Sequence, residues 1–285
     1  MPITGTTRVF YILGDPVAQV RAPQVYNHLF ERHGIDAVVV PLKLPAAALP
    51  GFLRHGMAAE NLGGFWATIP HKPALAELLD PTDPVAKVAG AVNAVRRLPD
   101  GRLEAALFDG IGFVKALDHF GIDVAGKRVL VVGAGGGGQA VAAAIAQRRP
   151  GSLAIHNRTP ERAQLLAERL QKLLGVPANV AATNDPAGYE LVVNCTSQGL
   201  QADDPLPFDP QRLDPHAAVV DIIMRAEPTP LLRAVRARGL RAEPGFEMLA
   251  QQVPEILRFF GFDALAQELQ DDLDPVRALF APTRR

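Results

Sequence analysis

A glycine-rich loop between an apolar strand and an alanine-rich helix constrains this chain more than any other feature. Val129 to Val132 is a β-branched, apolar run that is typical of a buried parallel strand. Gly133, Gly135 and Gly138 follow with G-x-G-x-x-G spacing, and Gln139 to Gln147 is rich in helix formers. The first glycine permits a tight turn, the second lets backbone approach a pyrophosphate, and the third lets the helix pack closely on the sheet. The helix N-terminus adds free N–H groups and a partial positive charge. The pattern predicts a dinucleotide site in a Rossmann-like domain.

The residues after the next strand indicate which dinucleotide fits. That strand is expected at 152–156, and proteins that use NAD usually place an acidic residue after it for the ribose hydroxyls. This chain has Asn157, Arg158 and Thr159 instead. No carboxylate repels a 2′-phosphate there, and the Arg158 guanidinium can bind such a phosphate with two parallel hydrogen bonds. The segment predicts NADP as cofactor. NAD use stays open, and so does a helix that merely packs, with Arg158 solvated.

Length and composition fit a globular protein of one large or two ordinary domains. The 285 residues are 48% apolar and 21% charged. With 29 basic and 30 acidic residues the formal charge is −1, so no charge excess directs the chain to nucleic acid or to a membrane. No signal-peptide pattern opens the chain, and the single cysteine, Cys195, excludes an internal disulfide, so a cytoplasmic protein is expected. The seven His are scattered, and no metal site is expected.

The alternation of strands and helices predicts an α/β fold with two α/β domains. Before the glycine loop, three strands (9–13, 37–41, 64–69), helices (24–33, 44–56, 74–79) and a hairpin over 91–107 form one layer. The close pair Pro81 and Pro84 predicts a loop between the last of these helices and the hairpin. After it, strands (152–156, 190–194, 217–223) and helices (160–174, 229–238) complete a Rossmann sheet. Helices at 248–260, 263–270 and 275–280 then follow without strands. We expect them to return to the first domain. The predicted domains are a substrate-binding domain of residues 1–109 and 246–285, and a Rossmann domain of residues 110–245.

Two charged residues at strand ends could transfer a proton. Lys72 lies just past an expected strand, behind Thr68 and Pro70, and Asp109 ends another. Ligands usually bind at the carboxyl ends of strands in α/β domains. A lysine and a carboxylate there can handle the proton of a hydroxyl group being oxidised, because the ion pair holds the geometry and desolvation lowers the lysine pKa. On spacing alone, a surface charge is the commoner interpretation of each.

A series of motifs resembles the shikimate dehydrogenase family and covers essentially the whole chain in the family's order. On the substrate side, Gly64-Phe-Trp-Ala-Thr-Ile-Pro-His-Lys72 is similar to G-x-N-V-T-x-P-x-K, Gly90-Ala-Val-Asn93 matches G-A-V-N, and Phe108-Asp109-Gly110 is similar to T-D-G. On the cofactor side, the similar segments are the glycine loop, residues 157–159 and Asn194-Cys-Thr-Ser-Gln-Gly199. The resemblance continues at Asp221, at Thr229-Pro-Leu231 and at Gly245-Phe-Glu-Met-Leu-Ala-Gln-Gln252.

The resemblance implies reversible hydride transfer between NADP(H) and a ring hydroxyl or ketone. It makes Lys72 and Asp109 the catalytic proton-transfer pair. Positions that match substrate-binding ones are Val20, Ala22, Trp66, Thr68, Asn93, Met224 and Gln252. Positions that match cofactor-binding ones are Gly133, Ala134, Gly135, Gly136, Gly137, Gly138, Asn157, Arg158, Thr159, Thr196, Ser197, Gly199, Ile222, Gly245 and Met248. It further implies a small cyclic substrate, a monomer or homodimer, and a place in aromatic amino acid biosynthesis or in quinate and shikimate metabolism.

Four positions depart from the family's substrate motifs. Its first motif is roughly G-x-P-x-x-H-S-x-S-P, and here the two carboxylate-binding serines are Val20 and Ala22. The tyrosine of D-x-x-Y is Met224, and the asparagine of G-x-N-V-T is Trp66, which could stack on a substrate ring or fill volume. Each hydrogen bond lost from a buried carboxylate costs about 1.5–3 kcal/mol. Arg21, in the middle of the altered motif, could compensate or could be solvated.

We therefore expect a dehydrogenase with weak or absent shikimate turnover and a more apolar cyclic substrate, or a carboxylate bound in another way. One alternative is an ordinary shikimate or quinate dehydrogenase whose pocket tolerates the changes. Another is a non-catalytic NADP(H)-binding regulatory module, against which the pair of Lys72 and Asp109 argues. A methyltransferase is disfavoured, because no acidic residue precedes Gly133 and because Asn157 and Arg158 replace the expected ribose carboxylate.

Overall fold

The computed structural model describes residues 2–201, 203–224 and 228–280. The chain divides into two compact units, of which the first joins Met1–Phe108 to Val253–Arg285 and the second is Asp109–Gln252. The units therefore meet in sequence at 108/109 and 252/253, where the sequence predicts 109/110 and 245/246. The second boundary differs because it falls inside a continuous helix, α9 (Phe246–Phe259), rather than at its start. Residues 281–285, which the prediction assigns to the first domain, lie outside the described residues.

The first unit contains a mixed five-stranded sheet in the order β2-β1-β3-β4-β5. β1 pairs in parallel with β2 and β3, whereas β4 is antiparallel to both of its neighbours, so the expected hairpin is confirmed. The strands are β1 (Arg8–Gly14), β2 (Ala37–Lys43), β3 (Leu62–Ala67), β4 (Ala94–Arg97) and β5 (Leu103–Ala106). The helices are α1 (Ala22–Arg32), α2 (Leu49–His55), α3 (His71–Leu79), α4 (Pro84–Ala89), α10 (Asp263–Asp271) and α11 (Asp274–Phe280), with 3-10 turns η1 (Ala46–Ala48) and η2 (Gly56–Ala58).

Helix α4 replaces a segment that the sequence predicts as a loop, because two prolines lie close together there. The Asp83 carboxylate accepts hydrogen bonds from Val85 N (3.2 Å) and Ala86 N (3.0 Å), which caps the helix. Pro84 occupies the first turn, where its missing N–H costs nothing, and Gly90 ends the helix with a φ of 56°. The proline therefore starts a helix here.

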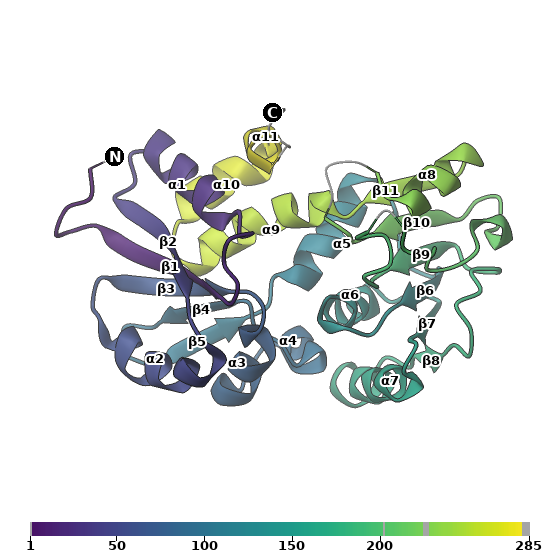
Figure 1. The fold of residues 1–285 in the computed structure, drawn as a ribbon, viewed down its shortest axis with the longest axis horizontal. Coiled ribbons are helices and arrows are strands. Elements are labelled where there is room, and N and C mark those ends of the chain that lie inside the picture. The colour runs from purple at the N-terminus through teal and green to yellow at the C-terminus, as the bar shows by residue number, and fades with distance from the viewer. Residues whose placement is uncertain (1, 202, 225–227, 281–285) are drawn as a thin grey trace. The chain divides into compact units, whose positions relative to one another are not determined.

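Alternation along β1 gives the first sheet two buried faces. Phe10 packs at 5.8 Å from Trp66, 5.1 Å from Phe260 and 6.4 Å from Phe30, measured between ring centroids, so this face lies under α1 and the C-terminal helices. Tyr11 points the other way, toward Phe52 of α2. Figure 1 shows α1 and α10 on one side of the sheet and α2 and α3 on the other.

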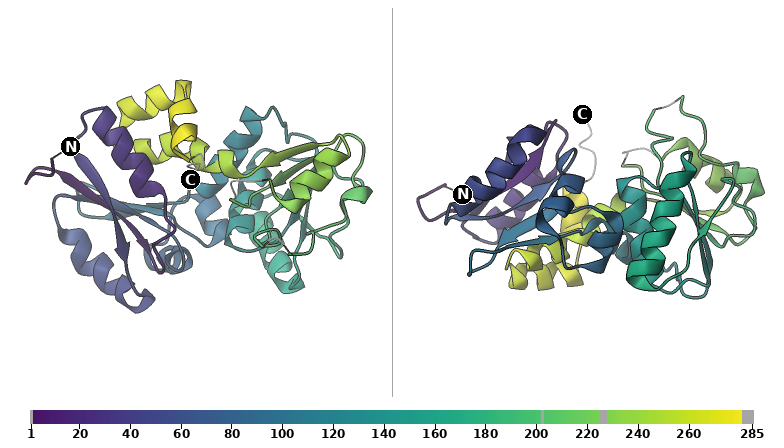
Figure 2. Two further views of the ribbon diagram at one scale, coloured as in Figure 1. Left: turned by 45° about the horizontal axis from the view of Figure 1, so that its top comes forward. Right: turned by 90° about the horizontal axis from the view of Figure 1, so that it is seen from below.

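Two arginines of the first unit hold the end of α9 on the sheet. The guanidinium of Arg8 donates to Phe260 O (3.2 Å) and lies 4.9 Å from the Phe262 ring centroid. Arg96 donates to Phe259 O and lies 4.7 Å from the centroid of that ring. Cations next to the last carbonyls of a helix offset its negative end, and the rings add cation–π attraction. In Figure 2 the yellow C-terminal helices accordingly lie beside α1, which comes from the start of the chain.

The second unit is a parallel six-stranded sheet in the order β11-β10-β9-β6-β7-β8. Counted along the chain, this is the Rossmann order, and the strand order reverses between β6 and β9. The strands are β6 (Arg128–Val132), β7 (Ser152–His156), β8 (Asn179–Val180), β9 (Leu191–Asn194), β10 (Ala218–Asp221) and β11 (Arg241–Pro244). The helices are α5 (Asp109–His119), α6 (Gly136–Gln147), α7 (Pro160–Leu174) and α8 (Pro230–Ala237), with the 3-10 turn η3 (Pro210–Arg212). The fold class is thus α/β, with two α/β units.

Continuous apolar runs in the strands bury both faces of the second sheet. Leu130 and Val192 pack in one cluster with Leu231 and Val235 of α8 and with Phe208 before η3. Helices α6 and α7 lie on the other side of the sheet in Figure 1. Among the helices of the described residues, none combines the length and apolarity that a membrane crossing requires.

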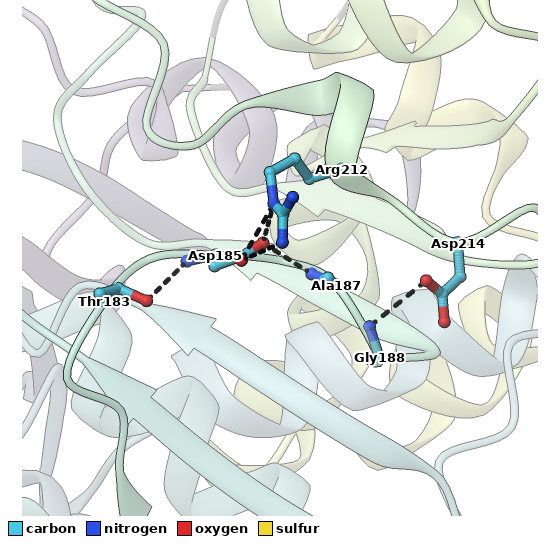
Figure 3. A network of polar contacts seen from close by, with 6 residues as sticks. All are labelled: Thr183, Asp185, Ala187, Gly188, Arg212 and Asp214. Carbon is cyan, nitrogen blue, oxygen red and sulfur yellow. Dashed lines mark hydrogen bonds and ion pairs between the residues drawn. The ribbon is translucent and has the colours of Figure 1, made fainter.

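A polar network fixes the loop between β8 and β9 (Figure 3). The carboxylate of Asp185 accepts from Arg212 Nη2 (2.7 Å) and Nε, and also from Ala187 N (3.1 Å). Asp214 accepts from Gly188 N (3.3 Å). The network joins this loop to η3 at the surface, where such pairs add little stability but hold a conformation.

Candidate active site

Hydrogen bonds of the main chain position Lys72 at the carboxyl end of β3. Thr68 N donates to Leu13 O and His71 N donates to Thr68 O, both at 2.9 Å, so the turn after β3 is tied to the end of β1. Lys72 lies half-buried in the first turn of α3. The fully buried His71 ring approaches Leu44 O through Nε2 (2.9 Å), which anchors the start of α3 to the end of β2. The lysine therefore stands on a rigid element.

Asn93 connects this turn to the end of β5. Its side chain is 5% exposed, and its Oδ1 accepts from Phe108 N (2.9 Å). Its backbone O accepts from Ala67 N (2.9 Å) and its N donates to Ala106 O (3.0 Å). Asn93 thus fixes the residue immediately before Asp109. Asp109 itself is half-buried and begins α5, in the second unit.

The altered first motif is apolar and half-buried in the structure. Val20 and Ala22 are both partly exposed, the latter as the first residue of α1. Arg21 is exposed, and its Nη2 donates to Leu279 O of α11 (3.1 Å). That contact supplies a partner for the guanidinium and gives no support to a role in compensating for lost serines.

Trp66 is a core residue of the first unit. It is 5% exposed and lies 4.6 Å from both the Tyr26 and the Phe260 ring centroids. Of the two interpretations of this residue, the structure favours volume filling, since the ring is enclosed by other aromatic rings. Thr68, two residues later, is half-buried.

The glycine loop after β6 is packed as its spacing predicts. Gly133 has a φ of +107°, and a Cβ there would lie 2.8 Å from the carbonyl of Cys195 after β9. A Cβ on Gly138 would lie 1.9 Å from Gly133 O, so α6 can approach the turn only because this residue is glycine. Around Gly135 and Gly136 nothing lies within 4 Å of an added Cβ, which leaves this side of the loop open. Gly137 follows in the same helical turn.

Asn157 braces that loop from the end of β7. Its Oδ1 accepts from Ala134 N and its Nδ2 donates to Thr159 O, both at 2.9 Å. Arg158 and Thr159 are exposed at the start of α7. The asparagine side chain is therefore engaged with the backbone, and Arg158 is the charged group of this segment that is exposed to solvent.

A buried polar network lies at the ends of β9 and β10. Asp221 and Asn194 are both 0% exposed and are register partners, and Asn194 Nδ2 donates to Asp221 Oδ1 (3.0 Å). Asn194 Oδ1 accepts from Thr196 N and Oγ1, and Thr229 Oγ1 donates to Asp221 Oδ2 (2.6 Å). The sequence assigns no role to Asn194 or Asp221. The signal was present, since each is a polar residue closing an apolar strand.

Burial makes the Asp221 carboxyl a contributor to the pH dependence of stability. Desolvation raises its pKa from the ordinary 3.8, against the opposing effect of the donated hydrogen bonds. The pKa of Asp221 is higher in the folded chain than in the unfolded chain, so ionising this carboxyl destabilises the fold. The free energy of unfolding therefore falls as pH rises from the ordinary pKa of 3.8 through the raised value of the folded chain. We expect the free energy of unfolding of Asp221→Asn, minus that of the wild type, to increase from pH 4 to pH 7. Urea unfolding of both proteins measures it. A difference that falls with pH would contradict the assignment.

The remaining cofactor-side positions surround the same strand ends. Ile222 Cδ1 would lie 3.0 Å from a Cβ on Gly137, and Gly245 packs against the backbone of Ile222. Burial, and to a lesser degree the charge of Asp221, raises the pKa of the Cys195 thiol, which suits a small packing residue. Residues Thr196, Ser197 and Gly199 form the loop after β9.

Helix α9 carries two further predicted residues. Met248 and Gln252 are 5% and 6% exposed, and a Cβ on Gly112 of α5 would lie 2.4 Å from Met248 O. Gln252 Nε2 donates back to Met248 O (3.4 Å). Met224, by contrast, is 40% exposed after β10.

The structure thus gathers the cofactor-side residues around the ends of β6, β7, β9, β10 and β11. In the first unit it gathers Thr68, Lys72 and Asn93 around the end of β3. Within the described residues no group of three or more His, Cys, Asp or Glu side chains could hold a metal ion.

Comparisons with known proteins agree with this arrangement. Residues 12–95 match the profile of the shikimate dehydrogenase substrate binding domain, and residues 115–198 match that of shikimate / quinate 5-dehydrogenase. A shikimate dehydrogenase (NADP(+)) of Rubrobacter xylanophilus is 40% identical over 90% of this chain and 91% of its own length.

Two solved structures have the same fold. Shikimate 5-dehydrogenase of Thermus thermophilus, solved in complex with shikimate, is 32% identical with a TM-score of 0.78 and covers 95% of this chain and 98% of its own. A 5-ketofructose reductase of Gluconobacter sp. strain CHM43 is 25% identical with a TM-score of 0.82 and covers 93% and 98%. Both profiles match in chain order, and the Rubrobacter xylanophilus enzyme is 40% identical over nine tenths of this chain. The protein therefore belongs to the shikimate dehydrogenase family.

Proposed function

We propose that this protein is an NADP-dependent dehydrogenase that interconverts a ring hydroxyl and a ketone of shikimate or quinate type. The observation that carries the proposal is the 40% identity to the Rubrobacter xylanophilus shikimate dehydrogenase (NADP(+)) over nearly the full length of both chains. Lys72, Thr68, Asn93 and Asp109 match the family's motifs, and the first three lie at neighbouring strand ends. This favours the ordinary dehydrogenase over the weak-activity interpretation that the sequence departures suggest.

The second unit has the features that a bound dinucleotide needs. The turn at Gly133 and the close packing of Gly138 present the N-terminus of α6, whose free N–H groups suit a pyrophosphate. The space around Gly135 and Gly136 leaves room for it. Arg158 is exposed after β7, and no carboxylate stands in the segment 157–159 to repel a 2′-phosphate. These features support NADP as the cofactor.

In this proposal Lys72 and Asp109 transfer the proton of the substrate hydroxyl. When bound, NADP+ would supply the acceptor for the hydride that leaves the carbon carrying the hydroxyl. Lys72 and Asp109 take the hydroxyl proton as the carbonyl forms, and they return it in the reverse direction. Asn93 keeps Phe108, and with it the start of Asp109, in place through its side-chain oxygen. The rigid turn at Thr68 and His71 holds Lys72.

Arg158 should decide the preference for NADP over NAD. A guanidinium bonded to a phosphate contributes about 1.5–3 kcal/mol, equal to about 10- to 150-fold in affinity. We therefore expect Arg158→Ala to raise KM for NADP+ by about that factor and to leave KM for NAD+ nearly unchanged. Initial rates with both cofactors measure this, and NAD+ serves as the internal control. An equal loss with both cofactors would contradict the role.

A redirected substrate is the second candidate. Val20 and Ala22 replace serines that the family uses for the substrate carboxylate, and no described contact of Arg21 replaces them. A structure of the same fold at 25% identity is a 5-ketofructose reductase, so this fold also serves a substrate of another class. This candidate predicts turnover of a cyclic alcohol or ketone without a carboxylate.

One experiment separates the candidates. Initial rates of NADP+ and NAD+ reduction are measured with shikimate, quinate and a panel of uncharged cyclic alcohols. Shikimate or quinate turnover at an efficiency well above that of the uncharged panel supports the ordinary dehydrogenase. Turnover confined to uncharged alcohols would overturn it in favour of a redirected enzyme. Tight NADPH binding without any turnover would overturn both and leave a cofactor-binding regulatory protein.

A further inference from the structure

The buried carboxylate of Asp221 lies at the end of β10, next to the end of β9. Asp221 ends β10, its side chain is 0% exposed, and its register partner on β9 is Asn194, which is also 0% exposed. Two fully buried polar side chains thus face each other at the carboxyl ends of adjacent strands. Buried polar groups are costly unless they are paired, so the pairing fixes both conformations.

Asp221 determines which way the Asn194 amide points. Asn194 Nδ2 donates to Asp221 Oδ1 (3.0 Å), and the opposite end of the amide, Oδ1, accepts from Thr196 N (3.0 Å) and Thr196 Oγ1 (2.7 Å). If the amide turned over, Asn194 Oδ1 would face the acceptor Asp221 Oδ1, and Asn194 Nδ2 would face another donor, Thr196 N. The carboxylate, together with Thr196 N and Gln198 O, therefore keeps the amide in the one orientation that serves the loop.

Asn194 and Thr196 make further hydrogen bonds within the loop after β9. Thr196 Oγ1 accepts from Gln198 N (3.1 Å), and Asn194 Nδ2 also donates to Gln198 O (3.3 Å). Both ends of the Asn194 amide are thus bonded to the backbone of the segment 194–199. This segment in turn packs on the glycine loop, since a Cβ on Gly133 would lie 3.0 Å from Thr196 N.

The Asp221 carboxylate also accepts hydrogen bonds from residues outside that loop. Its Oδ1 accepts from Ile223 N (3.2 Å) and its Oδ2 from Thr229 Oγ1 (2.6 Å), which caps α8 by accepting from Leu232 N. Asp221 therefore joins the loop after β9, the segment after β10 and the start of α8.

We propose that Asp221 is a positioning residue for the cofactor: acting through Asn194, it sets the conformation of the loop 194–199 that contacts the dinucleotide, without touching the dinucleotide itself. The proposal rests on the proposed function, since it takes NADP(H) as the ligand of that loop. What matters in it is an acceptor facing Asn194, not the negative charge.

The decisive comparison is between two substitutions of Asp221. Asp221→Asn keeps an oxygen toward Asn194 Nδ2 and Ile223 N, whereas Asp221→Leu has a similar volume and no acceptor. NADPH affinity is measured by fluorescence titration of the full chain. We expect the Kd for NADPH to rise about tenfold or more in Asp221→Leu and to stay within about threefold in Asp221→Asn.

Thr229→Val is the matched control for general destabilisation. It removes the bond from α8 to Asp221 and the cap on Leu232 N, but it keeps the carbon atoms that pack against Gly199 and leaves the Asn194 amide its acceptor. We expect a lower melting temperature with the Kd for NADPH within about threefold of wild type.

Wild-type affinity in a folded Asp221→Leu would overturn the proposal, and so would equal losses in Asp221→Leu and Asp221→Asn. If Asp221→Leu does not fold, Asn194→Ala carries the test, because it removes the amide and leaves Asp221 its bonds to Ile223 and Thr229. Retained NADPH affinity in that variant would overturn the proposal as well. Substrate turnover of the wild type is assayed in parallel. If the wild type binds NADPH but turns over no substrate, the proposed function is wrong, whereas the proposal for Asp221 is still tested by the NADPH affinities of the variants.

Discussion

Replacing Lys72 with alanine is expected to lower kcat by about 10²- to 10⁴-fold, the usual contribution of a general acid–base group. The physical reason is local. Lys72 lies half-buried in the first turn of α3, and the turn before it is fixed by Thr68 N to Leu13 O and His71 N to Thr68 O. The backbone of the variant should therefore keep its conformation and lose only the ammonium group. Initial rates with the best substrate of the panel measure the loss.

Cofactor binding should survive the same substitution. The predicted cofactor residues belong to the second unit, whereas Lys72 belongs to the first, so the Kd for NADPH should stay near that of wild type. Lys87→Ala is the matched control, because Lys87 lies on α4 of the same unit and pairs only loosely with Asp80, at 3.7 Å. If turnover of Lys72→Ala stays within tenfold of wild type, Lys72 is not the proton-transfer residue.

Replacing Gly138 with alanine should be the most damaging single-methyl change in the second unit. The new Cβ would lie 1.9 Å from Gly133 O and 3.1 Å from the Cβ of Cys195. Gly133 cannot move away easily, because its N donates to His156 O (2.7 Å) at the end of β7. Helix α6 would have to shift from the sheet. We expect a loss of about 3 kcal/mol in the free energy of unfolding, the upper end of the usual cost of overpacking.

The shift of α6 should also weaken NADPH binding, because its N-terminus would leave the place where the pyrophosphate is expected. Denaturant unfolding and NADPH titration measure the two effects. Gly136→Ala is the control for stability. It adds the same methyl group two residues earlier, where nothing lies within 4 Å, and alanine is the better helix former. Equal stability of the two variants would show that Gly138 is not required for close packing.

Much of the second unit could be predicted from local sequence. β7 and α7 have the predicted bounds, 152–156 and 160–174, because each shows a clear apolar pattern between proline or glycine signals. Gly133 and Gly138 have the conformation and packing that their spacing indicates, since both requirements are steric and act within one turn.

Other elements depend on partners that are distant in sequence. β11 alternates charged residues with Ala242 and Pro244, and it becomes a strand only because β10 offers a parallel edge. The two prolines near α4 indicate a loop, and a helix is predicted there only when the cap at Asp83 is considered with them.

The candidate site also has features that depend on residues distant in sequence. The sequence leaves open whether Trp66 stacks on a ligand or fills the core, and only the ring contacts of Tyr26 and Phe260 decide between them. The pairing of Asp221 with Asn194 also needs the register of β9 and β10, which no local pattern encodes.

The anchoring of α9 by Arg8 and Arg96 has a consequence for the order in which the chain folds. During synthesis the second unit is complete once Gln252 has emerged, because all of its strands precede that residue. The sheet of the first unit has been made much earlier, yet its Phe10 face is covered only in part, by α1, until Phe260 and Phe262 arrive. Domains generally fold as units as they leave the ribosome. The inserted unit therefore matures first, and the unit that begins the chain is the last to close.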